Sequence, residues 1–569
     1  MPSARKTAAI LSVILGLTAL GRAQDEQRVA PKTPPANPPA QIVTGAATSR
    51  PSENLELLHE LRGIVFVDAP NKIAAASSVR GISTAQAPLV NSASFRAVFK
   101  PYLGHPLTSD TLNEICAKVV SYCRKIDRPV VDAIVPQQDI TNGTVQILVL
   151  EGRVGQVRAE DNRFFPDKLI LGAVRARAAQ EISQNQILED VDWLNRNPFH
   201  QTDVIFERGQ ELGQTDLVLH TQDHFPVRPY IGYENTGTES TGEDRYFTGI
   251  NWGNAFGLDQ QLNYQFTMNP DVQRFWAHSG SYIIPLPWRN QLTILGNYSS
   301  SNVQTFPGLF QTGQSWQLGG RYEIPLPRLG GLSESIVLGG DFKRTNTNAD
   351  FGGSSVYSSF VDVVQFMGGY NVERVDRFGS TAASAQFFFS PGNIGGQDNA
   401  QDYQNARAGA DPRYEYLNAT LLRLTNLPES FSLATRFAGQ VASAPLLPTE
   451  QLGLGGMDSV RGYLEQEADG DDGIIFSNEL RTPSLSFFPK FKDALFFYGF
   501  VDYGVAWTRD AQVGQQGQTN FLGVGPGASY HIGPWFSVNY DYGWRLAQGN
   551  PSVQSHGRHN LRVVASILY

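Results

Sequence analysis

Apolar residues follow two different spacings along this chain, and the change comes near residue 228. Upstream, in the segment that opens at Thr108, they recur at every third or fourth position: Leu112, Ile115, Cys116, Val119, Tyr122 and Cys123. Downstream they alternate with polar residues, as Leu262, Tyr264, Phe266 and Met268 do with Asn263, Gln265 and Thr267. The first spacing predicts an α-helix with one apolar face, and the second predicts β-strands with one apolar and one polar face.

Upstream of residue 228 the predicted elements form two units with the same order: strand, helix, helix, strand, strand. In the first unit they cover residues 63–67, 94–103, 108–126, 130–135 and 144–150, and in the second 156–159, 166–178, 185–195, 203–207 and 215–220. Thr108 can cap the second helix of the first unit, and Asn142-Gly143 is typical of the turn between its last two strands. The repeated order predicts two small α+β domains. The loop from Asp68 to Ala93 is long for such a unit, and its role stays open.

Downstream, sixteen segments alternate between apolar and polar residues. They start near Arg228, Arg245, Gln260, Arg274, Asn290, Gln314, Ser333, Val361, Ser380, Glu415, Phe431, Gly473, Ala494, Asn520, Pro534 and Arg558. A soluble β-sandwich also alternates, but it rarely places so many aromatic residues on the face opposite a set of charges. A closed barrel in lipid requires this pattern, because its outer face contacts hydrocarbon and its lumen is polar. Bacterial barrels use even numbers of strands, so the sequence predicts a 16-stranded antiparallel transmembrane β-barrel.

The first residues predict export from the cytoplasm. Two basic residues precede an apolar stretch over 8–20, and Gly21-Arg22-Ala23 is a small-x-small cleavage site, so residues 1–23 are interpreted as a signal peptide. After residue 25 no uninterrupted apolar run approaches the roughly 18 residues that a spanning helix needs. The net charge of -9, with no basic stripe, argues against a nucleic-acid partner.

Between the signal peptide and the first unit the chain is rich in proline. Residues 24–51 contain the run Pro31-Lys32-Thr33-Pro34-Pro35, and this composition predicts a semi-rigid, unpacked linker. Residues 52–61 are expected to form a short helix, because Leu55, Leu58 and Leu61 would share one side of it.

The two cysteines, Cys116 and Cys123, lie seven positions apart on a predicted helix. Two helical turns separate such positions by about 10 Å, which is too far for a disulfide. We expect both to be buried as small apolar side chains.

A loop motif and a strand motif carry the candidate chemistry. The loop between the eleventh and twelfth strands, residues 444–472, contains Val460-Arg461-Gly462-Tyr463, and the thirteenth strand contains Gly499-Phe500-Val501-Asp502-Tyr503-Gly504. Alternation along that strand turns Asp502 into the lumen. A carboxylate there favours a bidentate partner, which Arg461 supplies if the loop folds into the barrel. Gly462 and the Gly455-Gly456 pair permit the tight backbone of a loop tip.

These motifs resemble those of the two-partner secretion transporters of the bacterial outer membrane, the ShlB/FhaC/HecB haemolysin secretion/activation family. The tetrad at 460–463 is similar to the tip of the loop that folds back into the barrel in that superfamily, and the motif at 499–504 is similar to the wall motif that carries its acidic partner. The two small units resemble POTRA domains, with Pro136-Gln137-Gln138-Asp139, Glu151-Gly152-Arg153 and Leu194-Asn195-Arg196-Asn197-Pro198-Phe199 as the similar phrases. The resemblance covers nearly the whole chain.

The resemblance implies a domain plan, a place and a function. The plan is a signal peptide at 1–23, a linker with a short helix at 24–61, POTRA domains at 62–154 and 155–226, and an outer-membrane barrel at 227–569, with the POTRA domains in the periplasm. The implied function is to bind an unfolded exported partner, of adhesin or haemolysin type, and to pass it to the cell surface. The last strand ends at Ile567 and Tyr569, and an aromatic C-terminus resembles the signal that barrel-assembly machinery recognises.

Other functions fit less well. A barrel-assembly factor of the same superfamily is the alternative, but such factors usually carry three or more POTRA domains; a passive porin would need neither these domains nor the tetrad. No catalytic motif and no metal-ligand spacing is found, so we expect no enzyme, cofactor or metal, and the acidic run Asp469-Gly470-Asp471-Asp472 is interpreted as a solvated turn rather than a calcium loop. Family transporters often have an N-terminal plug helix; residues 24–30 are too short for one, which argues against a helical plug.

Overall fold

The computed structural model describes residues 29–37, 42–43, 54–211, 213–306, 309–328, 332–351, 354–547 and 556–566. The predicted signal peptide and the C-terminal residues Ile567 and Tyr569 lie outside this part of the chain. The chain divides into two compact units, which are described separately below. One contains the barrel (Met1–Pro38, Asn197–Phe199 and His224–Tyr569), and the other contains the small domains (Pro39–Arg196 and His200–Asp223).

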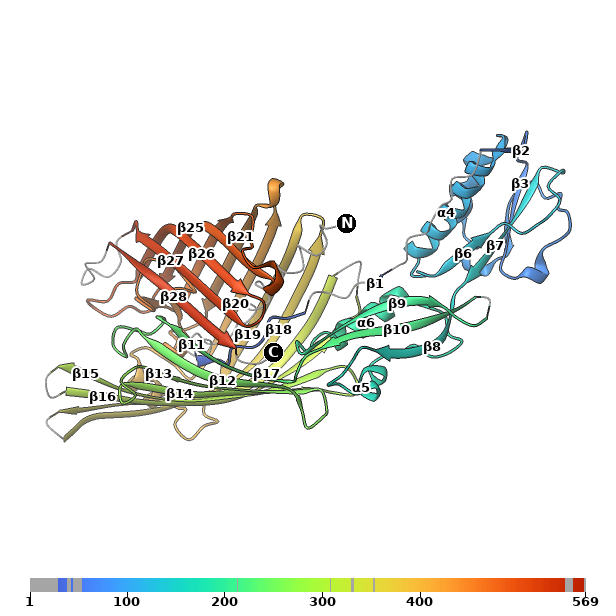
Figure 1. The fold of residues 1–569 in the computed structure, drawn as a ribbon. Coiled ribbons are helices and arrows are strands. Elements are labelled where there is room, and N and C mark those ends of the chain that lie inside the picture. The colour runs from blue at the N-terminus through green and yellow to red at the C-terminus, as the bar shows by residue number, and fades with distance from the viewer. Residues whose placement is uncertain are drawn as a thin grey trace. The chain divides into compact units, whose positions relative to one another are not determined.

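The barrel is a closed antiparallel sheet of sixteen strands, as the alternation predicts (Figure 1). Its strands are β11 (Val227–Glu234), β12 (Arg245–Ala255), β13 (Gln260–Met268), β14 (Phe275–Pro285), β15 (Gln291–Phe306), β16 (Leu309–Pro325), β17 (Leu332–Phe351), β18 (Ser354–Asp376), β19 (Gly379–Pro391), β20 (Arg413–Asn426), β21 (Ser432–Ala442), β24 (Asp472–Arg481), β25 (Asp493–Trp507), β26 (Gln518–Ile532), β27 (Phe536–Arg545) and β28 (Gly557–Ser566). The first and last strands close it, with Tyr230 opposite Ser566 and Glu234 opposite Arg562. No sheet edge is left in lipid, as a membrane barrel requires.

The two faces of the wall differ as the alternation predicts. Leu262 and Tyr264 on β13 are exposed on the outside, whereas Asn263 and Gln265, which alternate with them, are buried on the inside. The outer face therefore suits hydrocarbon, and the inner face supplies hydrogen-bonding groups to the lumen. Among the described residues, no helix is long and apolar enough to cross a membrane.

The connections differ between the two ends of the barrel. We call the end where β11 begins the proximal end and the opposite end the distal end. Short turns join strands at the proximal end; two of them contain the single-turn helices η4 (Pro428–Ser430) and η6 (Pro489–Phe491). The distal end carries the two longest connections: residues 392–412, with helix α7 (Ala400–Ala406), and residues 443–471, here called L6, with η5 (Pro448–Glu450), β22 (Leu452–Leu454) and β23 (Ala468–Gly470).

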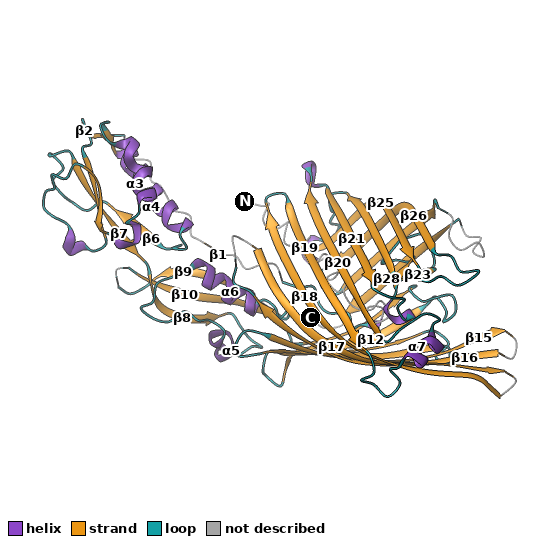
Figure 2. Ribbon diagram, turned by 180° about the vertical axis from the view of Figure 1, so that it is seen from behind, coloured by secondary structure: helices purple, strands orange, loops and turns teal. Residues whose placement is uncertain are grey.

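The first small domain packs two helices against a four-stranded sheet of order β4-β3-β7-β6 (Figure 2). Its elements are β2 (Glu56–Leu58), β3 (Gly63–Val67), η1 (Pro70–Lys72), β4 (Gly81–Gln86), η2 (Pro88–Val90), α3 (Ala93–Phe99), η3 (Lys100–Tyr102), β5 (Leu107–Thr108), α4 (Ser109–Lys125), β6 (Val131–Ile134) and β7 (Thr144–Glu151). Thr108 caps α4 through the N–H of Thr111, as expected.

The long loop from Asp68 to Ala93 has a structural role that the sequence left open. It contributes β4, which pairs in parallel with β3 and so places β3 inside the sheet. It also covers the sheet face opposite the helices, where Ile73 packs against Val65 and Val67. Strand β3 is therefore buried at every position, which explains why its sequence is continuously apolar.

The prediction of a short helix over residues 52–61 is wrong. Residues Glu56–Leu58 form strand β2, which pairs with β5, and the backbones of Leu55 and Ser109 are hydrogen-bonded beside it. Leu61 is buried in the domain core while Leu55 is exposed, so the three leucines do not share one face. Strand pairing with β5 therefore outweighed the helical preference that the spacing of the three leucines suggested.

The second small domain repeats the plan. Its elements are β8 (Arg153–Glu160), α5 (Asp167–Gly172), α6 (Gln184–Leu194), β9 (His200–Arg208) and β10 (Gln214–Asp223). A two-residue strand from the linker, β1 (Ile42–Val43), pairs in parallel with β9, so the sheet order is β1-β9-β10-β8. This part of the linker is thus packed, contrary to the expectation from its composition.

Both cysteines lie on α4 and are free, as predicted. Cys123 belongs to the core of the first small domain, and Cys116 packs against that core. Burial raises the pKa of each thiol to about 11.

Candidate functional site: the loop and segment inside the barrel

L6 folds back into the barrel and packs on its wall through an apolar cluster. Leu452, Leu454, Val460 and Tyr463 of the loop join Ala438, Ile475, Ala506 and Phe521 of strands β21, β24, β25 and β26. The ring of Tyr463 stacks on that of Phe521 with centroids 4.1 Å apart, and its hydroxyl donates to the carbonyl of Ala547 at 2.8 Å. These contacts fix the direction in which the loop tip points.

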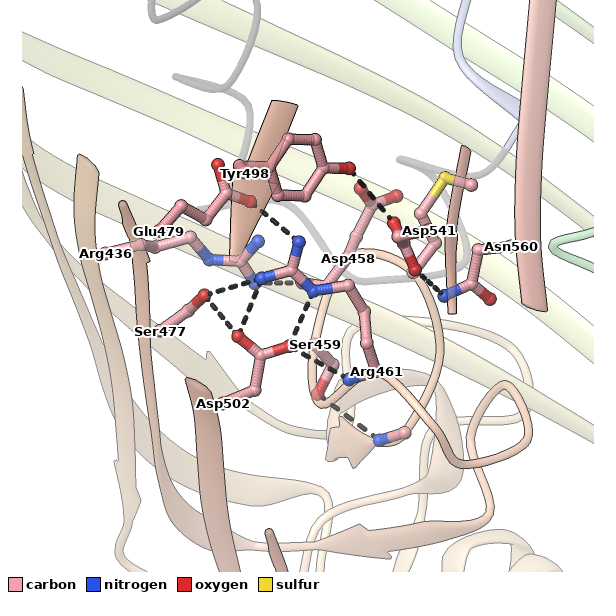
Figure 3. A network of polar contacts seen from close by, with 12 residues as sticks. Arg436, Asp458, Ser459, Arg461, Ser477, Glu479, Tyr498, Asp502, Asp541 and Asn560 are labelled. Carbon is pink, nitrogen blue, oxygen red and sulfur yellow. Dashed lines mark hydrogen bonds and ion pairs between the residues drawn. The ribbon is translucent and has the colours of Figure 1, made fainter. Parts of the chain in front are cut away.

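At the tip, Arg461 meets Asp502 (Figure 3). Nε and Nη2 of Arg461 donate to the two carboxylate oxygens of Asp502 at 2.6 and 2.8 Å, and the Arg461 backbone N–H donates to the same carboxylate at 3.1 Å. Asp502 is fully buried and the Arg461 side chain is 6% exposed. Such a two-pronged, charge-assisted pair fixes both distance and orientation.

Further wall groups complete the surroundings of the guanidinium. Glu479 accepts from Nη1 of Arg461 at 2.7 Å and is itself paired with Arg481. The Ser477 hydroxyl donates to Asp502 at 2.5 Å, and the guanidinium lies over the Phe500 ring, 3.6 Å from its centroid. Strands β24 and β25 thus supply two carboxylates, a hydroxyl group and an aromatic ring to the guanidinium of Arg461.

Glycines of the barrel wall make room for the loop tip, and we call this set the glycine seat. A Cβ atom on Gly523 of β26 would lie 1.9 Å from the Arg461 carbonyl oxygen, and one on Gly543 of β27 would lie 2.5 Å from the Gly462 nitrogen. Gly462 itself has φ +98°, a conformation that disfavours any side chain. Gly523 has a specific role, because the loop backbone occupies the place that its side chain would take.

The glycines of the wall motif differ in what they contact. A Cβ atom on Gly504 would meet Val460 and Leu454 of the loop at 2.8 and 2.9 Å, so Gly504 belongs to the seat. Gly499 faces outward with nothing within 4 Å of its Cβ position, so it makes no contact with L6.

Two buried carboxylates hold the base of L6. Glu450 accepts from Lys343 of β17 at 2.9 Å and from the Tyr416 hydroxyl at 2.9 Å. Asp471 accepts from Arg407 of the 392–412 loop at 2.5 and 2.8 Å and from the backbone N–H of Arg509, in the connection after β25, at 2.8 Å. The interpretation of this acidic run as a solvated turn is wrong for Asp471, which is fully buried and ties three distal loops together.

A segment from the N-terminal region also lies in the lumen. The Lys32 N–H donates to the Tyr230 hydroxyl at 2.9 Å, and the Gln265 side chain donates to the Val29 carbonyl at 3.3 Å. Asn37 donates to the carbonyl of Asn197 at 2.8 Å. Residues 29–37 were predicted to be part of an unpacked linker; they are instead bound to the inner wall of β11 and β13. Residues 24–28, where a plug helix was not expected, lie outside the described residues.

Lys32 joins a charge cluster at the seam between the first and last strands. Its ammonium group lies 3.4 Å from Glu234 of β11, which also accepts from Arg562 of β28 at 2.7 Å. Arg562 in turn pairs with Asp458 of L6 at 3.0 Å. The segment, the seam and the loop thus share one set of alternating charges. Sequence reasoning missed this cluster, because nothing in its separate positions links them.

No cluster of metal-ligating side chains accompanies these contacts in the described part of the chain. Within it, no group of three or more His, Cys, Asp or Glu side chains could hold a metal ion. The chemistry that the lumen offers is reversible pairing of charged and polar groups.

Comparison with known proteins places this arrangement in a family. Residues 213–530 match the haemolysin secretion/activation proteins ShlB/FhaC/HecB, and residues 78–152 match the ShlB-type POTRA domain. The chain belongs to this family. It is therefore an outer-membrane two-partner secretion transporter with its POTRA domains in the periplasm, so the proximal end of the barrel is periplasmic and the distal end faces the cell surface.

Relatives match along most of their length at low identity. The heme/hemopexin transporter protein HuxB of Haemophilus influenzae (strain 86-028NP) is 22% identical over 469 residues, which cover 81% of each chain. The outer membrane transporter CdiB-2 of Burkholderia pseudomallei (strain 1026b) is 23% identical, covering 87% of this chain and 83% of the relative. The solved structure of CdiB from Escherichia coli covers 93% of this chain and 94% of its own, with 18% identity and a TM-score of 0.70, and it shares the fold.

Proposed function

We propose that this transporter binds one unfolded exported partner in the periplasm and conducts it through the barrel lumen to the cell surface. The observation that carries the proposal is a lumen closed by polar contacts that can be exchanged: the Arg461–Asp502 pair at the loop tip and the bonds to residues 29–37. The partner class that fits the family is a large secreted exoprotein of adhesin or haemolysin type, exported and activated by this chain.

The free space in the resting lumen supports a passage that must first open. A cavity of about 390 Å³ lies along the wall of β14–β17, lined by hydroxyl and amide side chains that include Ser299, Ser315, Asn297 and Gln317. This volume is that of a small-ligand pocket, so this cavity by itself does not admit a polypeptide, and we expect the lumen contents to rearrange before passage. The lining also contains Arg245 and Lys343, so an unfolded chain would meet both hydrogen-bonding groups and positive charge there.

The two lumen elements differ in how firmly they are held. L6 combines an apolar cluster with buried ion pairs at its tip and base. Residues 29–37 are held by hydrogen bonds of Val29, Lys32 and Asn37 and by the 3.4 Å contact of the Lys32 ammonium, which is 23% exposed, with Glu234. We therefore expect the segment to be displaced by an arriving partner and the Arg461–Asp502 pair to keep the loop in place until then.

The small domains supply surfaces for an extended chain. In the first POTRA domain, β6 and β4 are the sheet edges, and the unpaired N–H and C=O groups of an edge can bind another backbone regardless of its sequence. Sequence-independent pairing suits the handling of an unfolded partner. We also propose that Ile567 and Tyr569 direct assembly of the barrel by the cell's barrel-assembly machinery.

Secretion of a candidate partner tests the proposal. A neighbouring reading frame that encodes a large repetitive exported protein supplies the candidate, which is expressed with and without this chain and measured in the culture medium. Surface release that depends on this chain supports the proposal. If deletion leaves release unchanged but lowers the amounts of other outer-membrane barrels, the chain is instead a barrel-assembly factor.

A further inference from the structure

The turn between β24 and β25, residues 482–492, exposes an unusual set of side chains at the periplasmic end. We call it the aromatic turn. Leu485, Phe487, Phe488 and Phe491 are each 50–60% exposed, and Lys490 and Lys492 are also exposed. The turn contains no acidic residue and is the longest proximal connection of the barrel within the described residues. A periplasmic turn bounded by water alone would not be expected to gather so many large apolar side chains.

Several backbone N–H groups of the aromatic turn are hydrogen-bonded within the turn or to β25. The Asp493 carboxylate accepts from the N–H groups of Phe487 and Phe488 at 2.8 Å each and from the Ser486 hydroxyl at 2.6 Å. Phe491 N–H donates to the carbonyl of Phe488 at 2.8 Å, and Leu485 exchanges two backbone bonds with Leu495 of β25. Pro483 and Pro489 have no N–H group. The turn therefore presents apolar side chains while several of its backbone N–H groups are already hydrogen-bonded, which lowers the cost of entering an apolar medium.

The apolar surface of the turn continues the lipid-facing wall. Leu480 of β24 and Phe497 of β25 face outward with 51% and 49% exposure. The backbone bridge of Leu485 with Leu495 brings the turn directly beside this outer face. The same periplasmic end carries Trp288 and Phe378 at the other turns, each next to an arginine in the sequence. Aromatic residues beside cations are the side chains that occupy the boundary between lipid and water.

From this continuity and charge we infer that the aromatic turn inserts into the periplasmic leaflet of the outer membrane and binds its phospholipids. The phenylalanines lie among the acyl chains, and Lys490 and Lys492 bind anionic headgroups such as that of phosphatidylglycerol. Because β24 and β25 also carry Ser477, Glu479 and Asp502, the turn anchors the very wall segment that holds the loop tip.

Depth measurement by spin labelling tests the inference. The full-length chain is made with Phe488→Cys, labelled with a nitroxide, and reconstituted in vesicles of phosphatidylethanolamine and phosphatidylglycerol. Accessibility to oxygen, which enters lipid, is compared with accessibility to a water-soluble nickel chelate. Phe497→Cys on the lipid face and Val513→Cys in a cell-surface loop are the matched controls. The unmodified chain gives the labelling background from Cys116 and Cys123, and Phe491→Cys replaces Phe488→Cys if that variant does not assemble.

The expected ratio of oxygen to nickel accessibility at position 488 is several-fold higher than at position 513 and approaches that at position 497. A ratio equal to that at position 513 overturns the inference, because the turn is then in water. A label shielded from both reagents also overturns it, because protein rather than lipid then covers the turn. Lys490→Glu with Lys492→Glu should lower the ratio in vesicles with phosphatidylglycerol and leave it unchanged in phosphatidylcholine alone; an equal change in both refutes the headgroup contact.

Discussion

Replacing Arg461 by alanine tests the central contact of the lumen. The change removes the bidentate pair with Asp502 and the bond to Glu479, while Val460 and Tyr463 keep their apolar contacts with the wall. Arg461→Lys is the conservative companion: it keeps the charge but loses the planar fork that reaches both oxygens of Asp502. The loop should undock in the alanine variant and do so less in the lysine variant.

The burial of the pair sets the magnitude. In the alanine variant the Asp502 carboxylate keeps the Ser477 hydroxyl at 2.5 Å and one backbone N–H, but it loses the cation that is hydrogen-bonded to it. Removing one partner of a buried ion pair costs about 3–5 kcal/mol, because the remaining charge stays desolvated. Since about 1.4 kcal/mol corresponds to a factor of ten, the undocked population should rise by roughly 100-fold to 4,000-fold.

Hydrogen exchange of the loop measures that population. Amides of the peptide that spans residues 452–464 should lose protection by the same factor in purified Arg461→Ala, and secretion of the partner should change with it. Barrel assembly is checked separately by heat-modifiable migration in gels. The matched control is Arg321→Ala, which breaks another buried pair, with Asp341, between β16 and β17.

The outcome distinguishes a loop-specific role from general stabilisation. The control should leave protection of the 452–464 peptide unchanged even if it weakens the barrel. If Arg461→Ala retains wild-type protection and normal secretion in an assembled barrel, the pair does not hold the loop and the reasoning from its burial is refuted.

Three further variants or measurements address other parts of the chain. Gly523→Ala places a methyl group within 1.9 Å of the loop backbone and should reduce secretion although every charge is intact. The control Gly499→Ala, with nothing within 4 Å of the new methyl group, should secrete as wild type does. Equal secretion by the two variants would contradict the role of Gly523 in seating the loop. Lys32→Glu sets a second carboxylate beside the buried glutamate of β11 and should release the segment, seen as higher single-channel conductance in planar bilayers; unchanged conductance argues against a plug there. Burial raises the pKa of Cys116 and Cys123 to about 11, so less thiolate is present at pH 8 and alkylation should be at least about 100-fold slower than after unfolding, rising with pH; equal rates in the two states would refute their burial.

The barrel was the part most readable from the sequence. Strands such as β12 and β13 alternate along their length, so the predicted starts near Arg245 and Gln260 coincide with these strands, and the count of sixteen is right. Alternation is a local property of an extended chain between lipid and a polar lumen, and it needs no knowledge of distant residues. The two motifs could be paired because they resemble the loop-tip and wall motifs of the family, and alternation independently turned Asp502 inward toward a matching cation.

The predictions for the N-terminal region were less accurate, because its sequence pattern is compatible with more than one contact partner in the fold. Proline-rich composition says that residues 29–37 will not form a helix or sheet core, but not that their backbone will bind side chains of Tyr230 and Gln265 in the lumen. Three leucines at helical spacing predicted a helix near Leu58, where pairing with β5 gives a strand. The composition of a segment limits the conformations that it can form by itself, but the strand or wall that it contacts decides which conformation it adopts.

The sequence by itself thus determined the membrane barrel, the order of the small domains and the residues able to join loop to wall. Only the tertiary structure decided that Gly523 must lack a side chain, that Asp471 joins three loops, and that Lys32, Glu234 and Asp458 share one charge cluster. Periodicity reports the two sides of each strand, which follow from backbone geometry and solvent. Contacts between segments tens to hundreds of residues apart depend on how the whole wall closes, and no local pattern encodes that closure.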